Sequence, residues 1–161
     1  MSQTTASVLF VCLGNICRSP TAQGVFETLL AKSPLAHQVR VDSAGTAAWH
    51  QGKAPDPRSR AVALSRGYDL EHLRARQVRE EDFSQFDFIL AMDGDNLRDL
   101  QQMAPESFQG ELRLFLDYAY PNQRRHVPDP YYTDGDSGFH EVVDLIEAAS
   151  QGLLTHLMQF K

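Results

Sequence analysis

Residues 7–20 read SVLFVCLGNICRSP and carry three local patterns in direct succession. The β-branched and aromatic run Ser7–Cys12 is typical of a buried strand. It stops at Leu13-Gly14-Asn15, where a glycine and an asparagine favour a tight turn. Ser19-Pro20 then supplies a cap-type residue and a proline that the start of a helix tolerates. We therefore expect a strand, a short loop and a helix that begins at about Arg18.

The rest of the chain alternates between strand patterns and helix patterns. Its apolar runs and turn residues predict strands at Gln38–Ser43, Phe86–Met92 and Leu112–Leu116, helices at Pro57–Arg66, Asp93–Met103 and Phe139–Phe160, and loops at Ala47–Pro57 and Pro121–Gly138. This order predicts an α/β fold of three layers, a mostly parallel sheet between helices. Ligands of such sheets bind beyond the carboxyl ends of the strands, and Cys12 stands at such an end.

Length and composition limit the classes of protein to which the chain can belong. With 161 residues and 42% hydrophobic composition it can fill one core, so we expect a single domain over residues 1–161. The N-terminal residues lack the pattern of a signal peptide, and no apolar run reaches the roughly 20 residues that span a bilayer. The net charge of −6 disfavours a nucleic-acid partner. We expect a cytoplasmic protein without membrane contact and, by default, a monomer.

The segment from Cys12 to Ser19 has the features of an anion cradle. Backbone N–H groups of a tight loop and the start of a helix attract an oxyanion, and the Arg18 guanidinium can bind two phosphate oxygens at once. The same positive field stabilises a thiolate at Cys12, and Ser19 is placed to hydrogen-bond that sulfur. A thiolate beside a bound phosphate is a nucleophile directed at phosphorus, and this chemistry requires no metal.

A buried, inert cysteine is the simplest alternative interpretation of Cys12 taken alone. The spacing argues against it, because a cysteine and an arginine with five residues between them, and a serine next, flank a glycine and an asparagine between a strand and a helix. A Walker-type phosphate loop is also disfavoured, since no glycine-lysine-serine/threonine follows Gly14.

The chain resembles the low-molecular-weight protein tyrosine phosphatases over nearly its whole length. The resemblance runs from VLFVCLGNICRSPTAQGVF through VDSAGT, Trp49, APDPR, RARQ, FDFILAMDGDNLRDL and VPDPYY to the closing helix. It implies a four-stranded parallel sheet flanked by helices, of flavodoxin-like type, and proteins that contain phosphotyrosine as substrates, with no cofactor. It also implies that Cys12 is the nucleophile, that Arg18 binds phosphate and stabilises the transition state, and that Asp129 is the general acid.

The residues themselves leave the choice of the acid open. A leaving tyrosyl oxygen needs a proton, and one carboxyl group that alternates between acid and base can serve both steps. The loop Pro121–Gly138 offers Asp129, Asp134 and Asp136, each of which could equally be a turn residue. Only the resemblance selects Asp129.

The expected substrate-binding residues fall into two groups. Loop residues surround the phosphate, and aromatic residues on other loops form the walls of a slot for a phenyl phosphate; the full set is Leu13, Gly14, Asn15, Ile16, Cys17, Ser19, Trp49, Tyr131 and Tyr132. The resemblance further implies that Ser43 and Asn15 support the loop, and that Cys17 can form a reversible disulfide with Cys12. His72 is left out of the catalytic set, because its run is displaced by one residue from that of many relatives.

Three rival functions remain to be compared with a phosphatase. An arsenate reductase on the same fold would need further cysteines after Cys17, and the sequence has none. A module that binds phosphotyrosine without hydrolysing it would be expected to lack Cys12, Arg18 or Asp129. A flavodoxin-like electron carrier would need a hydroxyl-rich loop without a reactive thiol.

Overall fold

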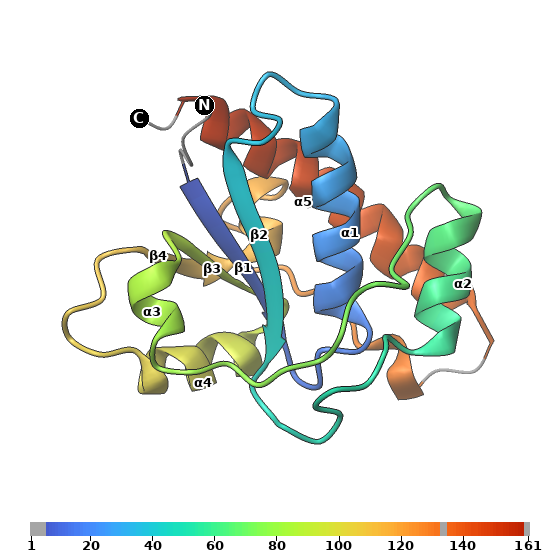
Figure 1. Cartoon of the computed structure of the whole chain (residues 1–161), viewed down its shortest axis with the longest axis horizontal. Coiled ribbons are helices and arrows are strands. Elements are labelled where there is room, and N and C mark those ends of the chain that lie inside the picture. Colours follow the sequence, from blue (N-terminus) through green and yellow to red (C-terminus); the bar gives the residue numbers. More distant parts are fainter. Residues whose placement is uncertain (1–5, 133–134, 160–161) are drawn as a thin grey trace.

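Four parallel strands form the centre of the computed structural model, which describes residues 6–132 and 135–159, with only the backbone of Tyr132. The strands are β1 (Ala6–Cys12), β2 (Val39–Gly45), β3 (Phe88–Ala91) and β4 (Glu111–Leu114). Their order is β2-β1-β3-β4, so β1 lies inside the sheet between β2 and β3 (Figure 1). The predicted α/β fold with a four-stranded parallel sheet flanked by helices is confirmed.

Helices cover both faces of this sheet (Figure 1). One face carries α1 (Arg18–Ala31), α2 (Pro57–Ser65) and α5 (Ser137–Gln159), and the other carries α3 (Asp82–Gln85) and α4 (Gly94–Met103). Alternate residues of β1 enter two separate cores, with Val8 and Phe10 in one and Leu9 and Val11 in the other. This double burial explains why Ser7–Cys12 is apolar without the alternation of a half-exposed strand.

The boundaries of several elements differ from the predicted ones. Strand β2 continues to Gly45, because Gly45 pairs with Cys12 on one side and forms a bridge with Gln77 on the other. Strand β4 ends at Leu114, where the chain tightens into a 3₁₀ helix, η1 (Phe115–Tyr118). The short helix α3 was not predicted, since its four residues are too few to show a period.

The C-terminal third also departs from the predicted loop. A 3₁₀ helix, η2 (Pro130–Tyr132), interrupts the segment Pro121–Gly138, and α5 begins at Ser137 rather than Phe139. The predicted end of this helix at Phe160 lies outside the described residues. Among the described helices, none has the length and apolar character needed to cross a membrane.

Candidate active site

The loop between β1 and α1 presents backbone N–H groups that no protein group accepts. Within residues 6–132 and 135–159, the amides of Gly14, Asn15, Ile16 and Cys17 donate to no acceptor. Helix α1 has no side-chain cap and no acidic residue in its first turn, so its positive end is also uncompensated. Buried N–H groups rarely lack acceptors in proteins, and the arrangement therefore indicates a site for an anion.

The sulfur of Cys12 lies at the base of this loop. It is 3.0 Å from Ser19 Oγ and accepts a longer bond of 3.5 Å from the backbone N–H of Ser19. The amide of Asn15 donates to the same hydroxyl oxygen at 2.8 Å, so the Ser19 hydroxyl proton can point to the sulfur or to the more distant carbonyl oxygen of Ala44, at 3.4 Å. Ser19 therefore does not cap α1 through its side chain; it solvates the sulfur, as the sequence predicted.

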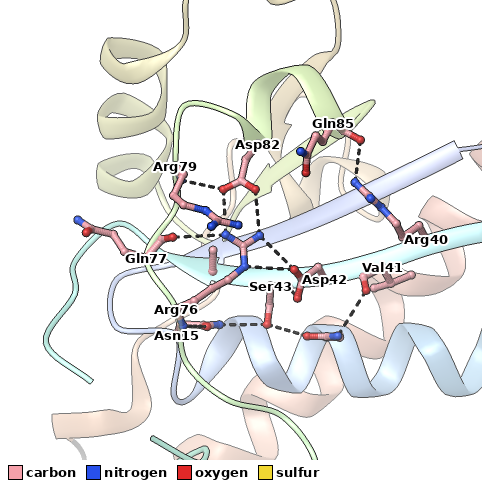
Figure 2. Close-up of polar contacts among 12 residues, drawn as sticks. Asn15, Arg40, Val41, Asp42, Ser43, Arg76, Gln77, Arg79, Asp82 and Gln85 are labelled. Atoms are coloured by element: carbon pink, nitrogen blue, oxygen red, sulfur yellow. Dashed lines mark hydrogen bonds and ion pairs between the residues drawn. The ribbon is translucent and has the colours of Figure 1, made fainter. Parts of the chain in front are cut away.

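Asn15 holds the loop in a conformation that costs energy. Its φ is 58°, in the left-handed region, where a residue other than glycine loses about 1–2 kcal/mol. The side-chain amide donates to Ser43 Oγ at 3.0 Å, and its carbonyl oxygen accepts from the backbone N–H of Arg76 at 3.0 Å (Figure 2). Ser43 in turn donates to Gln23 at 2.7 Å. The contact between Ser43 and the loop, which the resemblance implied, is present.

Gly45, which the sequence treated only as a turn residue, allows the loop to approach β2. A Cβ atom at this position would lie 2.7 Å from the carbonyl oxygen of Leu13 and 3.1 Å from the amide nitrogen of Asn15. Any larger residue would displace the loop itself, because both contacts are backbone atoms.

Arg18 is buried beneath the loop, with 2% of its surface exposed. Its Nη1 donates to Asp93 Oδ2 at 2.6 Å and to the carbonyl oxygen of Val127 at 3.1 Å, whereas its buried Nε has no partner among the described residues. Burial would lower the pKa of this guanidinium, but the charges of Cys12, Asp93 and Asp129 outweigh it and raise the pKa above its ordinary value. Arg18 is thus a permanent cation with a free donor.

Asp129 is the candidate acid that the structure brings to this cation. Its Oδ2 lies 3.6 Å from Arg18 Nη2, and its Oδ1 accepts the backbone N–H of Tyr131 at 3.0 Å. Asp136 is exposed, 3.8 Å from His140, and does not line this pocket. Asp134 lies outside the described residues.

One pocket joins these groups. Its lining residues are Cys12, Leu13, Gly14, Ile16, Cys17, Arg18, Trp49, His50, Asp129 and Tyr131. Trp49 and Tyr131 are 67% and 40% exposed and lie at its rim, as predicted. Asn15 and Ser19 do not line it; they lie buried beneath the loop. The side chain of Tyr132, predicted to be a wall of the slot, is outside the described part of the chain.

Two residues of the site were not found from the sequence. His50 lines the pocket, with its ring 6.2 Å from that of Tyr131, and Asp93 holds Arg18 in place. A single histidine beside Trp49 carries no spacing signal. From the sequence Asp93 was only the first residue of a predicted helix; in the structure its side chain caps α4 by accepting the N–H of Asn96.

Cys17 differs from Cys12 in reactivity. Both are free thiols, and a disulfide between them stays a prediction. Burial raises the pKa of the Cys17 thiol to about 12, with help from the charge of Asp56. The thiolate fraction of Cys17 at pH 7 is then about one part in 10⁵ and grows only as the pH rises toward 12.

We expect iodoacetamide at pH 7 to modify Cys12 alone, and phosphate to slow that reaction. Peptide mass spectrometry measures both rates, and modification of Cys17 at a comparable rate would contradict the assignment.

Comparisons with protein families and with curated proteins agree on the family of this chain. The family model described as low molecular weight phosphotyrosine protein phosphatase matches residues 7–161. The low molecular weight protein-tyrosine-phosphatase of Streptomyces coelicolor is 46% identical over 153 residues, which cover 93% of this chain and 92% of that protein.

Solved structures agree with this result. A protein tyrosine phosphatase from Entamoeba histolytica, crystallised with Hepes in its active site, superposes with a TM-score of 0.90 at 40% identity and covers 96% of this chain and 97% of its own. DARP, a Drosophila arginine phosphatase, superposes with a TM-score of 0.87 at 33% identity and covers 92% of this chain and 96% of its own.

Proposed function

The chain belongs to the low molecular weight phosphotyrosine protein phosphatase family, and we propose that it hydrolyses phosphotyrosine in proteins through a phosphocysteine on Cys12. One observation carries this proposal. The Cys12 sulfur, the unpartnered loop amides, the free Nε of Arg18 and the Asp129 carboxyl group belong to one pocket or its wall.

The first step forms the phosphocysteine. The phosphate oxygens bind to the loop amides and Arg18, and the Cys12 sulfur attacks phosphorus from the base of the pocket. The bond between phosphorus and the tyrosyl oxygen breaks as the bond to sulfur forms, and Asp129 gives its proton to the leaving oxygen. The amides and Arg18 stabilise the charge of the transition state without reorganising, because Asn15 and Asp93 already hold them in place.

The second step returns the enzyme to its starting state. Asp129, now ionised, accepts a proton from a water molecule whose oxygen attacks phosphorus. The bond between phosphorus and sulfur breaks, inorganic phosphate leaves, and Cys12 is again a thiolate. A hydrogen bond from Ser19 stabilises this leaving sulfur, since the sulfur, at 3.0 Å, is a nearer acceptor for its hydroxyl proton than the Ala44 carbonyl oxygen at 3.4 Å.

The rim favours a flat aromatic leaving group. The exposed rings of Trp49 and Tyr131 stand above the loop, and the side chains of Leu13 and Ile16 line the pocket. Aromatic rings bind one another through stacking or edge contacts. A phosphorylated tyrosine would present such a ring at this height, whereas a phosphorylated serine would bring its backbone to the rim.

The proposal is tested with Asp129→Asn and two aryl phosphates. p-Nitrophenolate leaves without much help from an acid, whereas phenolate and tyrosine need the proton. We expect kcat/KM to fall by about 10²-fold or more for phenyl phosphate and a phosphotyrosine peptide, and by a smaller factor for p-nitrophenyl phosphate. Product formation from each substrate is measured with a chelator present.

Asp136→Asn is the matched control, because Asp136 belongs to the same segment of the chain but lies away from the pocket. This variant should keep kcat/KM within about twofold of the wild-type value for each of the three substrates. Equal losses for the two leaving groups would contradict the acid role of Asp129. A wild-type protein that binds phosphate but turns over no aryl phosphate would favour the rival binding module, and a preference for a phosphoarginine peptide would redirect the assignment of substrate.

A further inference from the structure

An ion cluster lies beside β2, outside the pocket, around the guanidinium of Arg76 (Figure 2). Two of its nitrogens donate to the two oxygens of Asp82 at 3.0 Å each, and two donate to Asp42 Oδ2 at 3.1 and 3.2 Å. Nη1 also donates to the carbonyl oxygen of Gln77 at 3.3 Å. Asp82 is 1% exposed, so its charge depends on this arginine for compensation.

The main chain of the same residue contacts the phosphate loop. The N–H of Arg76 donates to Asn15 Oδ1 at 3.0 Å, and its carbonyl oxygen accepts the N–H of Gly45 at 2.8 Å. Asn15 is the residue that holds the left-handed turn, and Gly45 is the residue that the loop approaches most closely. The main chain of Arg76 therefore supports the loop directly at Asn15 and indirectly through Gly45 of β2.

This peptide has little regular structure to hold it. Residues 74–78 belong to no helix or strand, and one isolated bridge, Gly45 to Gln77, ties them to the sheet. Backbone hydrogen bonds of Ala75 with Gly52 and Lys53 hold the start of this peptide, and the side chain of Arg76 ties it to two further elements, because Asp42 lies on β2 and Asp82 begins α3. The Asp42 carboxylate also accepts the backbone N–H of Ser43 at 2.8 Å, and the hydroxyl of Ser43 accepts a hydrogen bond from Asn15.

We propose that Arg76 is a positioning residue of the phosphate loop: its ion pairs with Asp42 and Asp82 hold the peptide whose N–H fixes Asn15. This inference rests on the proposed function, because it concerns the shape of the same loop. Loss of the anchorage frees the Asn15 side chain, and the loop amides then diverge from the phosphate and its transition state.

The structure contains a matched control for this arginine. Arg66, on the far side of α2, bonds to Asp144 at 2.5 Å, to Glu147 at 2.8 Å and to the carbonyl oxygen of His140 at 3.2 Å. Its side chain is 24% exposed and that of Arg76 is 23% exposed. Both residues thus join two carboxylates and one carbonyl oxygen at equal burial, but Arg66 does not line the pocket or contact the loop.

The experiment compares Arg76→Met, Arg76→Lys and Arg66→Met with the wild type. The readouts are kcat and KM for p-nitrophenyl phosphate, the dissociation constant of inorganic phosphate by NMR, and the melting temperature. We expect Arg76→Met to lower kcat/KM by about tenfold to a hundredfold and to weaken phosphate binding, since small displacements of positioned groups have effects of this size. Arg76→Lys should recover part of the loss, because lysine keeps the charge but not the fork. Arg66→Met should change the melting temperature alone.

Equal kinetic effects of Arg76→Met and Arg66→Met would overturn the proposal, as would unchanged phosphate affinity in Arg76→Met. If Arg76→Met does not fold, Asp42→Asn takes its place, because Asp42 is 43% exposed and its substitution removes one ion pair only. Hydrogen exchange of the Arg76 amide should then speed up while the core amides stay protected. The outcome stays separate from the proposed function, because phosphate affinity and amide exchange are measured whether or not the wild type hydrolyses an aryl phosphate.

Discussion

Replacement of Cys12 by serine is expected to abolish turnover, with kcat for any aryl phosphate reduced by about 10⁴-fold or more. Serine keeps the shape of the site, but its hydroxyl is a weak nucleophile at neutral pH, and neither Ser19 nor Asp129 serves as its base. Ser19 is a hydroxyl itself, and Asp129 is bound to its own loop and faces Arg18. The loss therefore falls on the chemical step.

Binding of phosphate should survive this substitution. The loop amides and Arg18 make the cradle, and the hydrogen bonds of Asn15 with Ser43 and Arg76 and of Arg18 with Asp93 hold them without the sulfur. Removal of a negative sulfur relieves its repulsion of a phosphate dianion, so inorganic phosphate should bind Cys12→Ser at least as tightly as the wild type. Acid quench with ³²P-labelled substrate should trap protein-bound phosphate in the wild type and none in the variant. Substantial turnover by Cys12→Ser, or its failure to bind phosphate while folded, would contradict the assigned role.

Arg18→Lys is expected to lower kcat/KM by about 10³-fold although it keeps the positive charge. Different N–H groups of the guanidinium bind the protein and the phosphate. Nη1 is committed to Asp93 and to the Val127 carbonyl, and Nε remains for phosphate. One ammonium group cannot reach both sets of acceptors, so lysine either abandons the phosphate or leaves the Asp93 carboxylate unpaired.

The effect should appear in both substrate affinity and kcat, since Arg18 contacts the phosphate in the ground state and in the transition state. Steady-state kinetics with p-nitrophenyl phosphate and the affinity for vanadate measure the two parts. Arg60→Lys provides the control, because Arg60 pairs with the exposed Glu71 and does not line the pocket. A loss below about tenfold for Arg18→Lys would show that charge alone is sufficient at this position.

These two substitutions and the Arg76 variants act at different distances from phosphorus. Cys12 forms the bond, Arg18 binds the oxygens, and Arg76 acts through Asn15 on the shape of the cradle. The buried hydrogen bonds of Asn15, Ser19 and Ser43 connect Arg76 with the Cys12 sulfur. A loop with four unpartnered amides is costly without its ligand, so the protein needs this support to keep the loop in shape.

The sequence alone determined the fold class, the strand-loop-helix at Cys12 and the cradle, because these depend on local patterns. Eight consecutive residues contain the nucleophile, the turn and the cation, and the apolar run before them is long enough to mark a buried strand. The limits of β2 were less accurate and η2 was not predicted, since a bridge to Gln77 and a turn within a proline-rich loop have no period to detect.

Only the tertiary structure decided which distant residues complete the site. From the residues alone, Asp129 could not be separated from Asp134 and Asp136, and the roles of Asp93, His50 and Arg76 were not foreseen. Arg18 meets Asp93 across 75 residues of chain, and Asn15 meets Arg76 across 61. Such contacts follow from the order β2-β1-β3, which brings the carboxyl ends of non-consecutive strands together. A side chain's partner across that edge depends on packing of the whole sheet, and no local pattern records it.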